Sequence, residues 1–295
     1  MAERIVALLG GDRRELTLLP SLKAAGFTVQ TFGLPAAELP GGVKSCASIA
    51  EAVRGALLLI LPLPGVRDNG RLHAPFLPQP SPLLTAEDLA ECAPQTPVMV
   101  GVASPYLRRL CQDLQLPLYE IAEADEVAVP NAIPTAEGAL QLAMQELPVT
   151  INGLQALVLG FGRVGEALAL RLRALGADVV VANRGAGRFA RAARQGFALY
   201  PWATLAESLG RFDAVFNTVP ALVLDKGRLL ALRRDAVIID LASGGGGTDF
   251  AAAEELGLKA LHALSLPGKV APVSAGRLLG QVYPGLINQI LAENN

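Results

Sequence analysis

Three glycines follow an apolar run near the middle of the chain, in the order Gly160-x-Gly162-x-x-Gly165. Residues 156–159 predict a strand, and the residues after the second glycine predict a helix. In such a unit the first glycine permits a tight turn, the second lets a pyrophosphate approach the backbone, and the third lets the helix pack closely on the strand. The N–H groups and the positive dipole end of the helix bind the phosphates. We therefore predict a dinucleotide site that includes Gly160, Gly162, Arg163, Val164 and Gly165.

The end of the next strand, residues 179–182, should distinguish the two nicotinamide dinucleotides. NAD-binding units commonly place a carboxylate about 20 residues after the glycines, where it binds the ribose 2′-OH. Asn183 and Arg184 stand there in this chain, and Arg188 lies one turn further. A planar guanidinium suits a 2′-phosphate. NADP is therefore favoured over NAD, unless these arginines only form a solvated surface turn.

Three further strands, at residues 212–217, 236–241 and 259–263, are predicted to end at the same edge of the sheet as Gly160. A nicotinamide ring and a substrate would meet at that edge. The residues after these strands that we expect to contact the cofactor are Thr218, Val219, Pro220 and Ala242. The four glycines at 244–247 either belong to this site or form a flexible turn without a ligand.

The sequence identifies no general base to accompany the glycines. It contains no HExxH, GxSxG or Walker A motif and no Cys/His spacing typical of a metal site, so no metal is expected. His73 lies in a proline-rich stretch, and His262 lies in a predicted strand, where we expect it to pack in the core.

The composition is that of an α/β protein with large cores. Of the 295 residues 52% are hydrophobic and 18% are charged, and the net charge is −2. These values exclude a mainly disordered chain and argue against nucleic acid or an anionic membrane as a partner. The most apolar window, residues 55–66, contains Pro62 and Pro64 and is too short to span a membrane. Together with a short N-terminal apolar run and three cysteines without a pairing motif, this predicts a cytoplasmic protein.

The alternation of strands and helices predicts two doubly wound parallel-sheet lobes, the second a Rossmann dinucleotide-binding domain, joined by linker helices. The expected segments are an N-terminal substrate lobe (1–130), a linker helix (131–150), the Rossmann domain (151–273) and a C-terminal helix that packs back across the lobe boundary (274–295). Pro20 predicts a kink or a late start in the first helix. Six prolines between residues 62 and 82 predict a lid, a binding loop or a disordered insert.

Five blocks of the sequence together resemble a known family. The blocks are GGDRR, NAIPTAEGALQLAM, GFGRVG, DLASGGGGTDF and LPGKVAPVSAG. They resemble the A-subunit family of dipicolinate synthase from spore-forming bacteria, and the similarity extends over residues 4–291. The resemblance implies an enzyme that forms pyridine-2,6-dicarboxylate from a dihydro- or hydroxy-tetrahydro-dipicolinate. It also implies a separately encoded, flavoprotein-like B subunit of dipicolinate synthase as partner and the cytoplasm of the mother cell as location. The oligomeric state stays open, a homo-oligomer included.

A dicarboxylate substrate of this kind needs cationic and hydroxyl donors. On this resemblance we expect the substrate residues, in a cleft between the lobes, to be Arg13, Arg14, Asn131, Thr135, Ser243, Thr248 and Lys269. Because the ring becomes aromatic, positioning against the nicotinamide could suffice without a strong base. Two alternatives stay open. One is another two-lobed NADP-dependent dehydrogenase of amino or hydroxy acids, and the other is a non-enzymatic sensor of the NADPH/NADP ratio.

Overall fold

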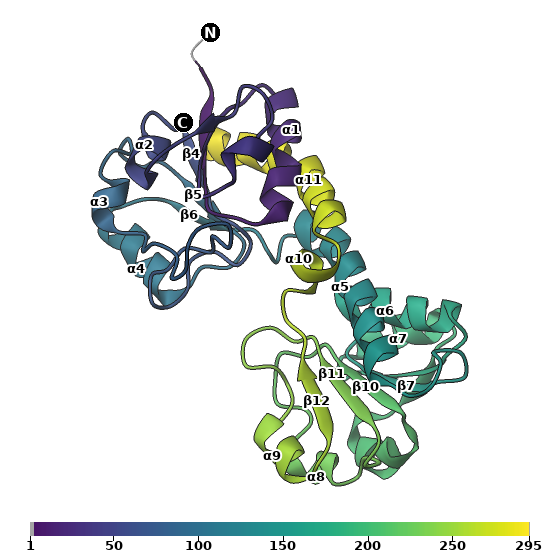
Figure 1. Cartoon of the computed structure of the whole chain (residues 1–295). Helices are drawn as coiled ribbons and strands as arrows, with labels where there is room; N and C mark the ends of the chain where they lie inside the picture. Colours follow the sequence, from purple (N-terminus) through teal and green to yellow (C-terminus); the bar gives the residue numbers. More distant parts are fainter. Residues whose placement is uncertain (1–2, 295) are drawn as a thin grey trace. The chain divides into compact units, whose positions relative to one another are not determined.

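The computed structural model describes residues 3–294, and its contacts divide the chain into two compact units. The N-terminal unit consists of Met1–Pro130 and Ala271–Asn295, and the central unit consists of Asn131–Val270. Residues 131–150, predicted as a linker, therefore group with the central unit. Each unit is a doubly wound parallel sheet with flanking helices, which confirms the predicted fold class (Figure 1).

The sheet of the N-terminal unit has six parallel strands in the order β3-β2-β1-β4-β5-β6. They are β1 (Ile5–Leu9), β2 (Thr28–Phe32), β3 (Lys44–Ser45), β4 (Leu58–Ile60), β5 (Val98–Val100) and β6 (Leu118–Glu120). Alternate residues of β1 enter different cores, Val6 and Leu8 on one face and Ala7 and Leu9 on the other. The strand must therefore be apolar throughout, because the sheet is covered on both faces.

The sheet of the central unit repeats this plan, in the order β12-β11-β10-β7-β8-β9. Its strands are β7 (Gln155–Leu159), β8 (Asp178–Ala182), β9 (Ala198–Tyr200), β10 (Ala214–Asn217), β11 (Val237–Asp240) and β12 (Lys259–His262). The strand order reverses between β1 and β4 in one unit and between β7 and β10 in the other. Ligands of such sheets bind at the carboxyl ends of the strands beside this reversal.

Two edge strands, β6 and β9, were not predicted from the sequence. Each has three residues, and most of these are half-buried or exposed. A short strand of this kind lacks the long apolar run that made the central strands recognisable.

Two long helices of the N-terminal unit, α1 (Arg13–Ala24) and α11 (Pro272–Glu293), pack against each other. Gly276 and Gly280 of α11 face α1 so closely that a Cβ at either position would collide with it. The predicted late start of the first helix is wrong, because α1 begins at Arg13 and continues through Pro20. The unit also contains α2 (Ile49–Val53), α3 (Ala86–Leu89), α4 (Pro105–Asp113) and the short η1 (Ala36–Glu38).

The linker helix predicted at residues 131–150 begins six residues earlier, as α5 (Asp125–Glu146), and contains Pro130 and Pro134. A proline removes one backbone donor, but the helix continues through both prolines, and its residues Ala132 and Ala136 are buried. The other helices of the central unit are α6 (Arg163–Ala174), α7 (Ala186–Arg194), η2 (Trp202–Arg211), α8 (Lys226–Leu229), α9 (Phe250–Glu255) and α10 (Leu266–Val270).

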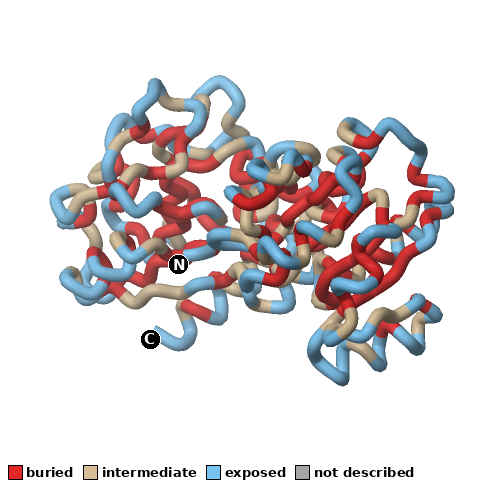
Figure 2. The backbone as a smooth tube through the Cα atoms, turned by 90° about the horizontal axis from the view of Figure 1, so that it is seen from below, coloured by how far each residue is buried: buried red, intermediate tan, exposed pale blue. Residues whose placement is uncertain are grey.

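Buried residues lie in the interior of each unit, and exposed residues lie mainly in the connecting turns and on the outer sides of helices (Figure 2). Among residues 3–294, no helix combines the length and the apolar character that a membrane span requires.

Candidate functional site

A cleft of about 420 Å³ opens in the central unit at the carboxyl ends of β7, β8 and β10. Its wall is formed by the turns after these strands, the start of α7 and the start of η2. The lining residues are Gly160, Gly162, Asn183, Arg184, Gly185, Gly187, Arg188, Trp202, Thr218, Val219 and Pro220. The structure thus brings together eight of the twelve residues that the sequence predicted for a cofactor. Of the other four, Arg163, Val164 and Gly165 form the first turn of α6, and Ala242 is buried after β11.

The three glycines have distinct geometry at the start of this cleft. Gly160 has a φ of +91° and therefore occupies the left-handed region that disfavours side chains. A Cβ at Gly165 would collide with the carbonyl oxygen of Gly160, so only glycine lets α6 approach the turn. Gly162 is the N-cap of α6, and no side chain caps this helix. The N-terminus of α6, which no side chain caps, therefore suits a pyrophosphate.

The end of β8 supplies cations and an amide to the cleft. Asn183 donates its side-chain N–H to the carbonyl oxygen of Gly185 at 3.0 Å, which shapes the turn. The exposed guanidinium of Arg184 lies over the ring of Trp202, 4.6 Å from its centroid. No carboxylate lines the cleft among the described residues. The described lining therefore carries positive charge from Arg184 and Arg188, which suits an anionic ligand.

Asp240, at the end of β11, organises the loop on the other side of the reversal. Its buried carboxylate accepts hydrogen bonds from the Asn217 side chain (3.1 Å), two backbone N–H groups at Ala242 (3.0 Å) and Gly247 (2.8 Å), and the Thr248 hydroxyl (2.6 Å). The sequence prediction missed this residue. A lone carboxylate at the end of an apolar strand gives no local sign that the chain will fold back onto it.

This network corrects the expectation for Thr248 and for the four glycines. The Thr248 side chain is buried and its hydroxyl is donated to Asp240, so it supports the loop instead of facing a ligand. A Cβ at Gly247 would collide with the Asn217 side chain and the carbonyl oxygens of Val219 and Ala221. Gly247 is therefore packed at the end of β10, whereas a Cβ added at Gly244 or Gly245 would meet no atom within 4 Å.

Other predicted residues of the central unit lie nearer the surface. Ser243 is exposed in the turn after β11, and Lys269 is exposed on α10. Thr135 lies on α5, where its hydroxyl donates to the carbonyl oxygen of Asn131 at 2.8 Å. His262 is exposed and stacks on Phe250 with ring centroids 5.1 Å apart, so the prediction that it packs in the core is wrong.

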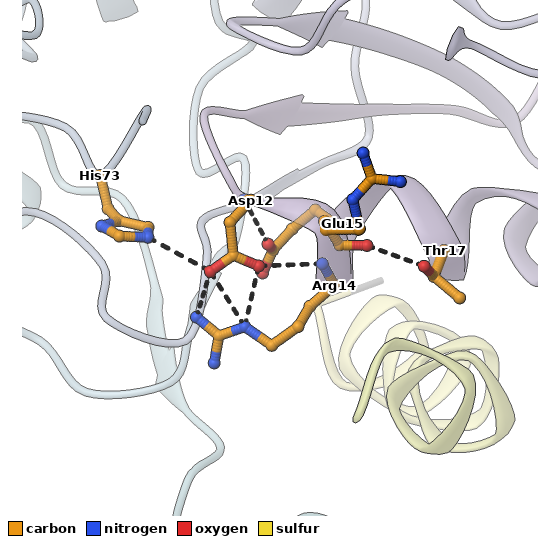
Figure 3. A network of polar contacts seen from close by, with 6 residues as sticks. Asp12, Arg14, Glu15, Thr17 and His73 are labelled. Carbon is orange, nitrogen blue, oxygen red and sulfur yellow. Dashed lines mark hydrogen bonds and ion pairs between the residues drawn. The ribbon is translucent and has the colours of Figure 1, made fainter. Parts of the chain in front are cut away.

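In the N-terminal unit the predicted substrate arginines have different environments. Arg13 is exposed and pairs with Glu38 at 3.4 Å. Arg14 is buried, and its guanidinium donates to both carboxylate oxygens of Asp12 at 2.8 to 3.2 Å (Figure 3). The ring of His73 reaches the same carboxylate at 3.4 Å. Arg14 thus has an internal partner, in contrast to its predicted role as a substrate ligand.

Burial and neighbouring charges shift the pKa values of the carboxyl groups in this cluster. Although burial opposes it, hydrogen bonds from His73 and Arg14 hold the pKa of Asp12 well below its usual range. Burial raises the pKa of Glu15 to about 7, and the negative charge of Asp12 adds to the effect. Burial also raises the pKa of the Tyr283 hydroxyl on α11, and the negative charge of Glu15 adds to this effect.

The proline-rich stretch is folded into the core of the N-terminal unit. Leu72, Ala74 and Leu84 of this stretch are buried. The carbonyl oxygen of His73 accepts the Gly11 N–H at 2.7 Å, directly at the carboxyl end of β1. The prediction of a disordered insert is therefore wrong.

Comparisons with known proteins agree with this division of the chain. The N-terminal domain of the dipicolinate synthase A subunit matches residues 5–122, and the NAD-binding domain of D-isomer specific 2-hydroxyacid dehydrogenases matches residues 135–264. The dipicolinate synthase A subunit of Bacillus subtilis (strain 168) is 33% identical over 290 residues, which cover 98% of this chain and 97% of that protein. The NAD-binding match identifies the cofactor of the central unit as a nicotinamide dinucleotide.

Solved structures of dipicolinate synthase A subunits are also similar to this chain. The dipicolinate synthase A subunit of Bacillus halodurans has a TM-score of 0.89 and 34% identity, with 96% of this chain and 97% of that chain covered. Its counterpart from Bacillus subtilis has a TM-score of 0.89 and 32% identity, with 99% and 98% covered. A transhydrogenase from Sinorhizobium meliloti shares the fold at 17% identity, with a TM-score of 0.73 and 98% and 94% covered.

Proposed function

Because the chain belongs to the A-subunit family of dipicolinate synthase and is an NAD(P)-dependent oxidoreductase, we propose that it forms pyridine-2,6-dicarboxylate with NADP as oxidant. The substrate is dihydrodipicolinate or the 4-hydroxy-tetrahydro compound that loses water to give it. The observation that carries the proposal is the open, cation-lined cleft beside an uncapped helix α6, in a chain of this family.

The choice of NADP is supported by the end of β8. Arg184 and Arg188 are exposed cations in the cleft lining, and the position of an NAD-selective carboxylate is held by Asn183. A guanidinium can bind a 2′-phosphate through two parallel hydrogen bonds. The glycine turn and the N-terminus of α6 would hold the pyrophosphate, with Thr218 and Val219 directly beside Gly160.

The oxidation balances without a metal. A nicotinamide bound in the cleft would supply the acceptor for a hydride from a ring carbon of the dihydro compound. The neighbouring ring position loses a proton, so two electrons and two hydrogens leave and the ring becomes aromatic. Because aromatisation favours this proton loss, the chain is required mainly to position the ring.

Exposed polar groups of each unit are proposed to bind the substrate carboxylates. In the central unit these are Lys269 and Ser243, and in the N-terminal unit Arg13 is the exposed guanidinium of the Gly-Gly-Asp-Arg-Arg turn. Asn131, half-buried on α5, offers an amide. Lys269→Ala and Arg13→Ala should each raise KM for the substrate and leave the affinity for NADP nearly unchanged.

The family name also supports a partner and a location. We propose that a B subunit joins this chain in a dipicolinate synthase complex, in the cytoplasm of the mother cell. Co-purification of the two tagged chains tests this assembly, and separate elution of both would contradict it.

The proposal is tested by incubating the purified chain with enzymatically made hydroxy-tetrahydrodipicolinate and NADP. The expected result is the ultraviolet absorbance of the pyridine product, together with one NADPH for each product molecule. Tight NADPH binding without product, with and without the B subunit, would instead indicate a sensor. Turnover of another amino or hydroxy acid would indicate a different dehydrogenase.

A further inference from the structure

We propose that Trp202, the single tryptophan of the chain, positions Arg184 for a 2′-phosphate and thereby sets the preference for NADP. The inference rests on the proposed use of NADP. Trp202 follows β9 at the start of η2 and was not among the residues predicted for the site.

The ring of Trp202 is placed where it can hold this guanidinium. It lines the cleft together with Arg184, whose guanidinium carbon lies 4.6 Å from the ring centroid. The ring is half-buried and packs against the core cluster that contains Leu205 and Leu209 of the same helix. A ring fixed in this way is a rigid surface for a cation.

A second arginine supports the same ring from within the unit. The Arg228 guanidinium carbon lies 5.6 Å from the Trp202 centroid. Its position is fixed by the carbonyl oxygen of Val223 at 3.0 Å and by the carboxylate of Asp225 at 3.3 Å. Asp225 also caps α8, so it is itself held in place. Asp225, Arg228, Trp202 and Arg184 thus form a continuous series of contacts that ends in the cleft.

This arrangement lowers the entropy that Arg184 loses when it binds a phosphate. An exposed arginine loses rotamer entropy when a ligand fixes its side chain. Stacking on Trp202 restricts the rotamers before a ligand arrives, and a surface cation–π contact contributes about 0.5–1 kcal/mol. Loss of the ring should therefore reduce the preference for a 2′-phosphate by about two- to five-fold, at about 1.4 kcal/mol per tenfold.

A role in stacking on adenine would have a different signature. Adenine is common to NADP and NAD, so loss of a stacking surface would weaken both ligands by the same factor. A positioning role through Arg184 weakens only the ligand that carries the 2′-phosphate. It also disappears when Arg184 is absent, which makes a double-mutant cycle decisive.

The experiment is calorimetric titration of the full chain with 2′,5′-ADP and with 5′-AMP, which differ only in the 2′-phosphate. The variants are Trp202→Leu, Trp202→Phe, Arg184→Ala and Trp202→Leu combined with Arg184→Ala. Arg194→Ala, an exposed arginine of α7 outside the cleft lining, controls for the general loss of positive charge. Circular dichroism establishes that each variant is folded.

We expect Trp202→Leu to reduce the ratio of the two affinities by about two- to five-fold, with a smaller effect for Trp202→Phe, which retains a ring. In the Arg184→Ala background the same change should leave the ratio constant. In the wild type, 2′,5′-ADP should change the emission of the single tryptophan more than 5′-AMP does.

Equal weakening of both ligands by Trp202→Leu, or an unchanged ratio, would overturn the positioning role while leaving the use of NADP intact. A wild type that binds 2′,5′-ADP no better than 5′-AMP would overturn both the inference and the proposed use of NADP. These fragments lack the nicotinamide, so the result does not depend on which substrate the enzyme oxidises.

Discussion

The turn after β1 and the turn after β7 begin alike and end differently. Gly10 and Gly160 both have positive φ, +77° and +91°, and each donates its N–H to the end of the neighbouring strand. The helix that follows β1 is then capped by Asp12, whose carboxylate accepts the Arg14 N–H at 2.9 Å. The helix that follows β7 is capped by Gly162, which has no side chain.

This difference explains why two sheets of the same strand order present different sites. In the N-terminal unit the chain supplies its own anion to the helix N-terminus, and the carbonyl oxygen of His73 satisfies the Gly11 N–H. In the central unit no side chain caps the corresponding helix, and a cleft opens beside its N-terminus. Topology thus fixes the edge at which a ligand could bind, and the N-cap residue decides whether an external phosphate can use it.

Gly162→Asp should give the turn after β7 an N-cap carboxylate like that of the turn after β1. Of the variants considered, it should have the largest effect on ligand binding. Gly162 is extended, with φ of −85°, and a Cβ there would contact only the Arg188 guanidinium at 3.9 to 4.0 Å, so the side chain fits. A carboxylate next to the pyrophosphate should weaken NADPH binding by about 100-fold or more, because like-charge contacts cost several kcal/mol. Calorimetry measures the affinity.

The same variant should remain as stable as the wild type or become slightly more stable, because an aspartate N-cap exceeds glycine by a few tenths of a kcal/mol. Gly162→Ser is the matched control, since it adds a cap without a charge and should weaken NADPH less than the aspartate does. Wild-type affinity in Gly162→Asp would show that the phosphates bind elsewhere.

Asp12→Ala should destabilise the N-terminal unit and leave NADPH affinity unchanged. The variant removes the helix cap and leaves the buried Arg14 without its carboxylate, which together should lower the free energy of unfolding by about 3 kcal/mol. Urea unfolding followed by circular dichroism measures the loss. Arg13→Ala is the control, because the exposed Arg13–Glu38 pair should contribute less than about 1 kcal/mol. Equal effects of the two variants would contradict a structural role for the cluster.

Glu15→Gln should remove a pH dependence that belongs to this cluster alone. The pKa of Glu15 is about 7 in the folded chain against 4.5 for an ordinary carboxyl. Because the unfolded chain releases this proton first, the wild type should lose stability as the pH rises from about 4.5 to 7, by about 3 kcal/mol at most.

The contribution is therefore complete below the unfolded pKa and is lost near the folded pKa. The stability of Glu15→Gln relative to the wild type should increase over the same range, as measured by urea unfolding at several pH values. A difference that does not change with pH would show that Glu15 is not the titrating group. The charged neighbours Asp12 and Arg14 keep their charge in this range, since the pKa of Asp12 is lowered and that of Arg14 is raised.

The sequence predicted the fold and the cleft for physical reasons that are local. Apolar runs of the right length predict the central strands, and glycines at fixed spacing predict the turn after β7. The Asp12–Glu15 spacing is also local: it is a capping pair in which the Glu15 side chain accepts the Asp12 N–H at 2.7 Å. This spacing indicates that Asp12 is the N-cap of the following helix.

Other features depend on contacts between distant segments and could not be predicted in the same way. Asp240 becomes the centre of a network only when the loop to Thr248 folds back on it. Trp202 reaches the cleft because it follows β9, which pairs with β8, a placement set by the packing of the whole unit. The sequence shows that Arg184 follows the strand β8 and is a candidate phosphate ligand. It does not show that the Trp202 ring lies against this arginine.

Arg184→Ala should reduce the preference for NADP over NAD, because it removes contacts to the 2′-phosphate alone. One or two charge-assisted hydrogen bonds from Arg184 should contribute about 1.5–3 kcal/mol, or about 10- to 150-fold in favour of NADP. Removal of the guanidinium should reduce NADP affinity by most of that factor and leave NAD kinetics little changed. Asn183→Asp should shift the preference further from NADP towards NAD, because the carboxylate repels the 2′-phosphate and accepts hydrogen bonds from the ribose hydroxyls. Steady-state kinetics with both cofactors give the ratio, and a wild type that uses NAD as well as NADP would show that the end of β8 does not recognise a 2′-phosphate.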